Sequence, residues 1–241
     1  CGRMVERCTV CVLIDLKLSS DHKRPMLIQS EATKPMGAAH DRVYRALRSR
    51  IMHGEIDPGQ ALTLRGIGKE FGVSMTPARE AGRRLIAEGA LFLSSSGRVS
   101  TPELSNERIE ELATLRALLE PELASRALPR AHLALIDRLE EINNRVASVI
   151  ARQDAPGYIR LNLEFHRTLY LRAQAPAMLA MAETVWLQLG PTMSKLYGRL
   201  RRTEPPRNHK LILAALKAGD EASLKLAVRA DATQGLRMLK V

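Results

Sequence analysis

Beyond Pro102 the sequence is a succession of segments with helical periodicity, separated by proline and glycine. In the first of them, a capping pattern that begins at Ser105 precedes the apolar residues Ile109, Leu112, Leu115, Leu118 and Leu119. Aromatic residues make up only 3% of the chain, so Leu and Ala must supply most of the core, and both favour helices over a β-sandwich. Helices are therefore expected over residues 105–127, 130–153, 155–173, 176–199, 206–218 and 220–239.

The charge of the chain favours a polyanionic partner without identifying it. The sequence has 37 Lys and Arg residues against 26 Asp and Glu, a formal net charge of +11, and such a surplus attracts nucleic acid. No apolar run approaches the roughly 18–20 residues of a membrane-spanning helix, so a soluble protein without a membrane partner is expected. The cysteines all lie within residues 1–11, and the cysteine-free remainder suits the reducing cytoplasm.

Composition also divides the chain into three parts. Residues 1–36 are predicted to be a poorly ordered N-terminal extension, 37–102 a first folded domain and 103–241 an all-helical domain. Cys8 and Cys11 in the extension have the spacing of half a zinc site, but the sequence has no second cysteine pair to complete it. No metal function is therefore assigned to them.

Residues 40–101 have the pattern of a small nucleic-acid-binding domain. Helices are expected over 40–53, 63–71 and 74–88, and the Ser/Gly turn within 90–101 predicts a β-hairpin. Three helices and a hairpin within about 60 residues are typical of a winged helix-turn-helix, whose third helix enters the major groove of DNA. The fold class expected for the whole chain is mainly α, with an N-terminal winged helix-turn-helix and a C-terminal antiparallel helical bundle.

The start of the third helix carries side chains suited to DNA. Ser74 and Thr76 can bond phosphates or base edges, and Arg79 can bond guanine or reach a phosphate. The hairpin tip, residues 94–98, is small enough to lie in a minor groove or along the backbone. The alternative is that these arginines only form a solvated face.

Three segments in fixed order resemble a known family. They are Ile51–Gly59 (IMHGEIDPG), Phe71–Glu80 (FGVSMTPARE) and Arg84–Gly89 (RLIAEG). Residues 43–102 thereby resemble the DNA-binding domain of the GntR family of bacterial transcription regulators. From the resemblance and the helix-turn-helix pattern together, the residues expected to contact DNA are Arg65, Ser74, Met75, Thr76, Arg79, Arg83, Gly97 and Arg98.

This sequence departs from the family at several positions. Met75 stands where the family usually has Arg, so apolar contact with a thymine methyl would replace a charged base reader. Gly66, Gly68 and Gly82 lie inside expected helices, and each costs about 1 kcal/mol relative to Ala. A less stable domain and an altered operator are expected.

Three segments of the helical region resemble the FCD domain, the ligand-sensing bundle of the FadR subfamily. They are Ile109–Pro121, Asn162–His166 and His209–Asp220. Many FCD domains hold a divalent metal through one Asp and three His. The matching positions here are Asn162, His166, His209 and Asp231, so one carboxylate is kept and an amide replaces an imidazole.

The resemblance implies a metal centre for Zn, Ni, Mn or Fe, with weaker zinc binding because Asn is a poor ligand. A polar effector pocket without metal and a vestigial site are the alternatives. In the family, the residue matching Arg116 often faces the effector, where a guanidinium can clamp a carboxylate. The alternative is a helical pair between Arg116 and Glu120. If Arg116 and the metal face one cavity, the effector is expected to be a small organic acid.

The sequence therefore predicts a homodimeric, cytoplasmic transcription regulator on a near-palindromic double-stranded operator, modulated by a small-molecule effector. It is not expected to be an enzyme, because the helical phase of Glu164, the nearest candidate base, points it away from Asn162 and His166. A metal-dependent enzyme is one alternative. The other is a small-molecule or metal-binding helical protein that has lost specific DNA binding.

Overall fold

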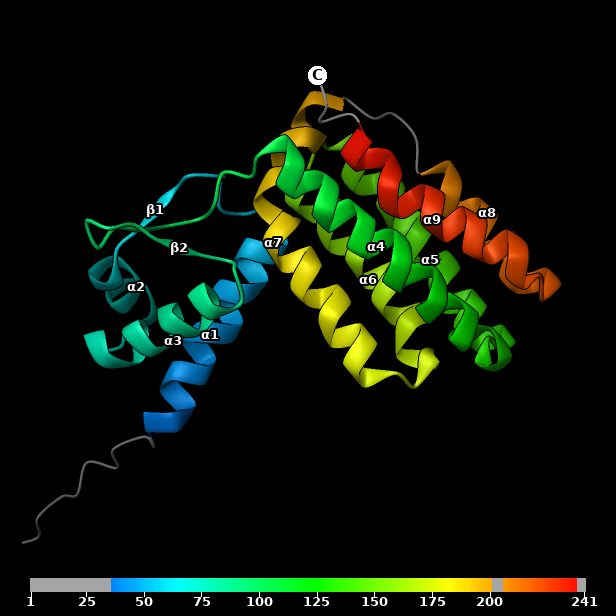
Figure 1. The fold of residues 1–241 in the computed structure, drawn as a ribbon. Helices are drawn as coiled ribbons and strands as arrows, with labels where there is room; N and C mark the ends of the chain where they lie inside the picture. Colours follow the sequence, from blue (N-terminus) through cyan, green and yellow to red (C-terminus); the bar gives the residue numbers. More distant parts are fainter. Residues whose placement is uncertain (1–35, 201–205, 238–241) are drawn as a thin grey trace, which may run out of the picture. The chain divides into compact units, whose positions relative to one another are not determined.

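The structure, a computed structural model, describes residues 36–200 and 206–237. The described part is mainly helical, which confirms the expected fold class (Figure 1). Residues 1–35 of the predicted extension lie outside it. None of the helices in these two ranges has the length and apolar character needed to span a bilayer.

The N-terminal part is a winged helix-turn-helix. Its helices are α1 (Met36–Met52), α2 (Leu64–Phe71) and α3 (Met75–Ala87), as the sequence predicts. The predicted hairpin is present as β2 (Phe92–Leu93) and β3 (Val99–Ser100). A further strand, β1 (Ala61–Leu62), was not predicted, because two residues are too short for a periodic signal.

The β-sheet has the order β1-β3-β2, with antiparallel neighbours. Val99 of β3 is paired with Leu62 on one side and with Leu93 on the other. The sheet therefore connects the start of α2 to the hairpin that follows α3, and this fixes where the hairpin tip extends.

Local signals set the ends of α2. The Thr63 hydroxyl accepts a hydrogen bond from Gly66 N at 3.0 Å, and Gly72 ends the helix with φ at +61°, in the left-handed region that favours glycine. The α1 residues Val43, Leu47 and Ile51 form a stripe along one face of the helix and are fully buried. This stripe packs α1 against α3 and holds the helix-turn-helix together.

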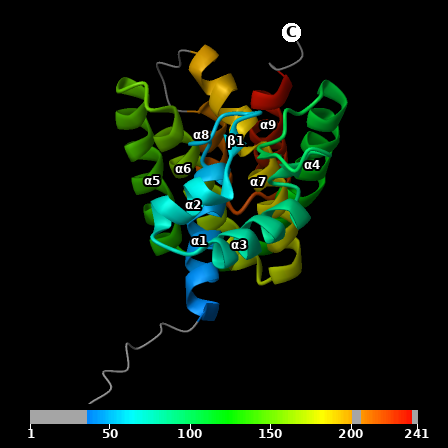
Figure 2. The same ribbon diagram turned by 90° about the vertical axis from the view of Figure 1, so that its left-hand side faces the viewer.

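The C-terminal part is a bundle, and the six α-helices within its described residues match the predicted segments to within a few residues. They are α4 (Asn106–Ala127), α5 (Leu133–Ala151), α6 (Ala155–Tyr170), α7 (Pro176–Leu200), α8 (Arg207–Ala218) and α9 (Glu221–Arg237). Helix α4 packs along α9 and α7, and α5 packs along α6. Figure 2 shows α5 and α6 on one side of the bundle and α4 and α9 on the other.

The helix glycines of the DNA-binding part have different surroundings. A Cβ atom at Gly68 would lie 2.9 Å from the Val73 carbonyl oxygen, whereas one at Gly82 would lie 3.5 Å from Leu64 Cδ2. The first distance is a clash with backbone and the second is an ordinary contact. Gly68 is therefore required, because the backbone at Val73 approaches it closely. Nothing comparable requires Gly82, which is expected only to lower the stability of its helix.

The variant G82A should raise the free energy of unfolding by up to about 1 kcal/mol, because it removes the backbone entropy of glycine from a helix interior. The matched variant G68A should lower it, because the new methyl group meets the Val73 carbonyl. Chemical denaturation measures both. Equal effects of the two substitutions would contradict this assignment.

Candidate nucleic-acid interface and metal centre

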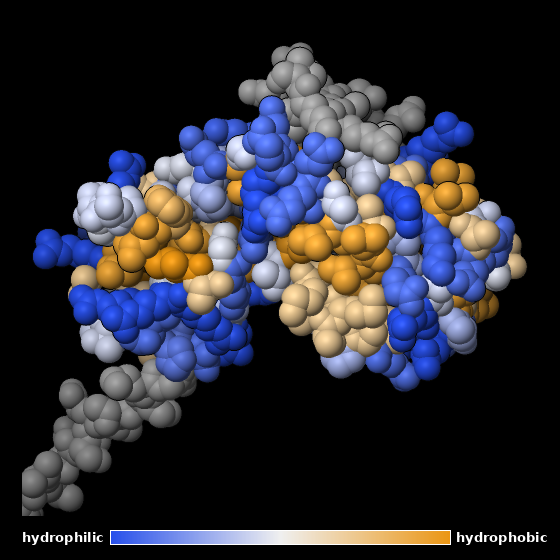
Figure 3. Space-filling view, in the orientation of Figure 1, coloured by the Kyte–Doolittle hydropathy of each residue, from blue (hydrophilic) through white to orange (hydrophobic). Residues whose placement is uncertain are grey.

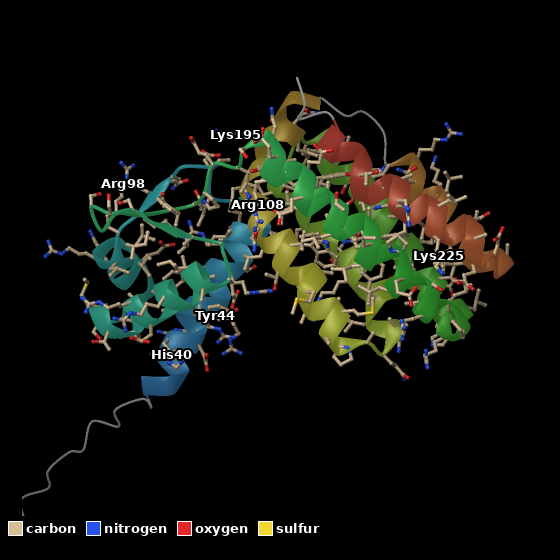
Figure 4. All side chains as sticks on the ribbon, viewed as in Figure 1. His40, Tyr44, Arg98, Arg108, Lys195 and Lys225 are labelled. Atoms are coloured by element: carbon tan, nitrogen blue, oxygen red, sulfur yellow. The ribbon has the colours of Figure 1, made fainter. Side chains whose placement is uncertain are left out.

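The start of α3 and the hairpin tip present an exposed surface. Arg98 projects from the hairpin (Figure 4), and hydrophilic residues line the visible edge of α3 (Figure 3). The predicted DNA-contacting residues are all exposed, namely Arg65, Ser74, Met75, Thr76, Arg79, Arg83, Gly97 and Arg98. These residues are therefore sterically accessible to a double helix.

The hairpin tip is held in a tight turn. The Gly97 N–H donates to the Ser94 carbonyl at 2.9 Å, and Gly97 has φ at +81°. The backbone N–H of Arg98 donates to Ser94 Oγ at 3.0 Å. A non-glycine residue would be strained at position 97, so the turn that presents Arg98 depends on this glycine.

The two adjacent arginines of α3 have different partners. Arg83 is exposed and pairs with Glu80 on its own helix, with 3.1 Å between Nη1 and Oε1. The Arg84 guanidinium lies over the Tyr44 ring, 3.7 Å from its centroid, and 3.5 Å from a Glu88 oxygen. Arg84 therefore packs α3 onto α1, and Arg83 faces outward.

Three of the four predicted metal ligands meet inside the bundle. His166 comes from α6, His209 from α8 and Asp231 from α9, and their donor atoms lie within 4.8 Å of one another. His166 Nε2 is 2.8 Å from Asp231 Oδ2. Both histidines are completely buried and the Asp231 side chain is 9% exposed. Two imidazoles and a carboxylate in this arrangement suit a borderline divalent cation.

The charge of the Asp231 carboxylate is stabilised by its neighbours. Burial alone would raise the pKa of Asp231, but the hydrogen bond and charge of His166, with His209 and Arg116 nearby, hold it well below its ordinary value. The group is therefore ionised at neutral pH, as a metal ligand must be.

His209 is held by two residues that the sequence did not single out. Its Nδ1 lies 3.1 Å from Asn143 Oδ1, and its ring stacks on Phe165 with 4.0 Å between centroids. Asn143 occupies a buried position on the apolar stripe of α5, between Leu139 and Val146. A polar residue within such a stripe is the one sequence signal that could have identified it.

The fourth predicted ligand, Asn162, lies one helical turn before His166 on α6. It lines a small cavity together with Arg116, Trp186 and Met193, and with Met52 from α1. The cavity has an interior volume of about 30 Å³, room for no more than a few water molecules. Arg116 and Asn162 therefore face the same small space.

Arg116 forms the pair with Glu120 that was the alternative to an effector contact. Arg116 Nε lies 2.5 Å from Glu120 Oε1, and both side chains are buried. Tyr170 OH donates to Glu120 Oε2 at 3.0 Å, and Trp186 Nε1 donates to Oε1 at 2.9 Å. Burial alone would raise the pKa of Glu120, but Arg116, the nearby His166 and the Trp186 hydrogen bond lower it overall. The pair is compatible with an effector contact, because Arg116 also lines the cavity.

Glu164, the candidate general base, pairs with Arg138 at 2.8 Å and with Arg145 at 3.5 Å. Both arginines belong to α5. These ion pairs direct the carboxylate towards exposed arginines, in agreement with its predicted helical phase.

Family models match most of the chain. The model described as "Bacterial regulatory proteins, gntR family" matches residues 39–99, and the model of the FCD domain matches residues 111–233. The HTH-type transcriptional regulator McbR of Escherichia coli (strain K12) is 26% identical over 196 residues, 80% of this chain and 89% of McbR. The gluconate operon transcriptional repressor of Bacillus subtilis (strain 168) is 31% identical over 191 residues, 75% of this chain and 76% of the repressor.

Solved structures agree with these matches. The structure titled "E. coli McbR/YncC" has a TM-score of 0.76 at 25% identity and covers 83% of this chain and 96% of its own. A putative transcriptional regulator GntR from Rhodococcus sp. RHA1 has a TM-score of 0.69 at 20% identity, with 84% and 97% covered. The second likeness supports the fold alone. Both extend over the winged helix and the bundle.

Replacing Arg116 with Met should lower the free energy of unfolding by about 3–5 kcal/mol, because the Glu120 carboxylate would remain buried without its charge partner. The double variant R116M/E120Q should lose less than the sum of R116M and E120Q, since no buried charge is left unpaired. Chemical denaturation of the full cycle measures the coupling. Additive effects would contradict the pairing.

Proposed function

The chain belongs to the GntR family of bacterial regulatory proteins and carries an FCD domain, and we propose that a small organic acid bound in its helical domain modulates its binding to an operator. The observation that carries the DNA-binding part is the exposed start of α3, where Ser74, Thr76 and Arg79 lie within the matched helix-turn-helix. Residues of these types bond phosphates and base edges.

Symmetry determines the form of the operator in this proposal. A homodimer with a two-fold axis would present two copies of α3 to equivalent half-sites, so the operator is near-palindromic double-stranded DNA. Residues 37–102 form the DNA-binding domain and residues 103–241 the effector-binding and dimerisation domain. The protein acts in the cytoplasm and is not an enzyme, which accords with relatives that are transcription regulators.

Arg116 supports an organic acid as the effector. Its pair with Glu120 uses Nε and Nη2, so the guanidinium retains donors at Nη1 for a carboxylate. One relative is named for the operon of gluconate, a sugar acid. Since the cavity beside Arg116 has room for only a few water molecules, an organic acid enters only when lining side chains such as Met193 and Met52 move.

That movement provides the physical basis for regulation. Met52 is the last residue of α1, the first helix of the helix-turn-helix, and it lines the cavity with residues of the bundle. An effector that displaces Met52 favours one arrangement of α1 over another, and differential affinity for the two arrangements shifts their populations. The effector thereby alters the fit of α3 to the operator.

His166, His209 and Asp231 would hold a divalent cation, with Asn162 as the weaker fourth ligand. Zn, Ni, Mn and Fe are all compatible with this donor set. When bound, the cation supplies positive charge near Arg116, and this favours an anionic effector. The chain's own residues bury this site and orient its ligands.

The variant R79A should bind the chain's own upstream DNA about 10- to 100-fold more weakly, because one base or phosphate contact is lost. Gel retardation at moderate salt measures this. R145A is the matched control, because it removes an exposed arginine from α5 in the bundle and should leave the affinity unchanged. Equal losses of DNA affinity in R79A and R145A would mean that Arg79 contributes only non-specific positive charge.

The variant H166A should lose bound metal, because it removes a buried imidazole from the ligand set. Elemental analysis of purified wild-type and variant protein measures the metal content per chain. H132A is the matched control, since His132 is an exposed residue that caps the start of α5. Equal metal content in wild type and H166A would reject the proposed centre.

A further inference from the structure

Each of the two clustered histidines has one ring nitrogen beside a buried residue outside the cluster, and His166 also contacts Asp231 within it. His209 places Nδ1 at 3.1 Å from Asn143 Oδ1. His166 places Nε2 at 2.8 Å from Asp231 Oδ2 and Nδ1 at 3.2 Å from the Tyr170 hydroxyl. Asn143 is 7% exposed and Tyr170 is 1% exposed, so solvent does not compete for these contacts.

Asn143 determines which nitrogen of His209 carries the proton. Its side-chain oxygen only accepts hydrogen bonds, so His209 Nδ1 must donate to it. A neutral imidazole protonated at Nδ1 has its lone pair at Nε2. His209 therefore presents the nitrogen that can bind a cation, and the stacked ring of Phe165 restricts its rotation.

Tyr170 fixes the tautomer of His166 in a similar way, and Glu120 orients the Tyr170 hydroxyl. Its hydroxyl lies between His166 Nδ1 at 3.2 Å and Glu120 Oε2 at 3.0 Å, and it has one proton to donate. The ionised Glu120 only accepts, so the hydroxyl donates to Glu120 and its oxygen accepts from His166 Nδ1–H. Arg116 and Trp186 complete the shell of Glu120 and hold it in place.

These hydrogen bonds determine how His166 Nε2 can bind a cation. At 2.8 Å, a proton lies between His166 Nε2 and Asp231 Oδ2, and it is this proton that a divalent cation would displace. Once the cation has displaced that proton, Nδ1 keeps its own proton towards Tyr170, so the ring becomes neutral and binds through Nε2. Metal-ligating histidines commonly donate their other N–H to a buried acceptor of this kind.

We propose that Tyr170 and Asn143 are positioning residues of the metal centre, which hold His166 and His209 in the tautomers that present Nε2 to a cation. The inference rests on the proposed centre of His166, His209 and Asp231. A purely structural role for these hydrogen bonds would affect folding stability and leave the affinity for metal unchanged.

The test is titration of the full chain with Co²⁺, followed by the visible absorption of the bound ion. Y170F and N143L should each bind Co²⁺ about 10- to 100-fold more weakly than wild type, with altered absorption bands. N143D should restore binding, because its carboxylate also accepts from His209 Nδ1–H. Y44F is the matched control: it removes a Tyr–Glu hydrogen bond between Tyr44 of α1 (Figure 4) and Glu88 at the end of α3, and should bind as wild type does.

The outcomes separate this inference from the centre itself. If wild type, Y170F and N143L bind Co²⁺ equally, the positioning role is overturned and the centre stands. If Y170F and N143L melt at lower temperature but keep wild-type affinity, their role is structural and the inference is overturned. If wild type binds no Co²⁺, the centre is rejected and the inference falls with it. Because the two substitutions lie on different helices, either folded variant decides the question alone.

Discussion

One buried carboxylate, that of Glu120 on α4, organises the interior of the helical domain. It is fully inaccessible to solvent and accepts from Arg116 on its own helix, Tyr170 on α6 and Trp186 on α7. A buried ion costs several kcal/mol unless it is paired and hydrogen-bonded. Loss of any of the three donors would therefore destabilise the folded state. Three helices thereby meet at a single point with defined side-chain geometry.

The same network connects the two places where ligands are proposed. Tyr170 extends it to His166 and the metal cluster, and Arg116 extends it to the wall of the small cavity. A cation at His166 and an acid at Arg116 would therefore act on one set of hydrogen bonds. Coupling between two ligands needs such a shared element, whose arrangement each of them biases.

Most of the fold could be predicted because its signals are local. Proline and glycine separate the helices, apolar residues follow the helical period, and Thr63 and Gly72 mark the ends of α2. Strand β1 was not predicted, because its pairing with β3 depends on residues far along the chain. The spacing of Arg116 and Glu120 allowed the observed pair but could not show that it is buried.

The site was predictable only in part, because its geometry depends on helices that are distant in sequence. His166, His209 and Asp231 were identified through the family resemblance, and the structure brings them together. Tyr170, Trp186 and Asn143 were not identified, since a tyrosine or tryptophan in a helix is ordinary core material until its partner is known. Only Asn143, a polar residue in an apolar stripe, had a local signal.

The proposed function requires that the winged helix of this chain recognises a specific DNA sequence. The most direct measurement is the ratio of its affinity for the region upstream of its own gene to its affinity for unrelated DNA of equal length at moderate salt. We expect a clear preference for the upstream region, with both affinities falling as salt rises. Equal affinity for the two DNAs would contradict it and would favour a helical sensor that has lost specific DNA binding.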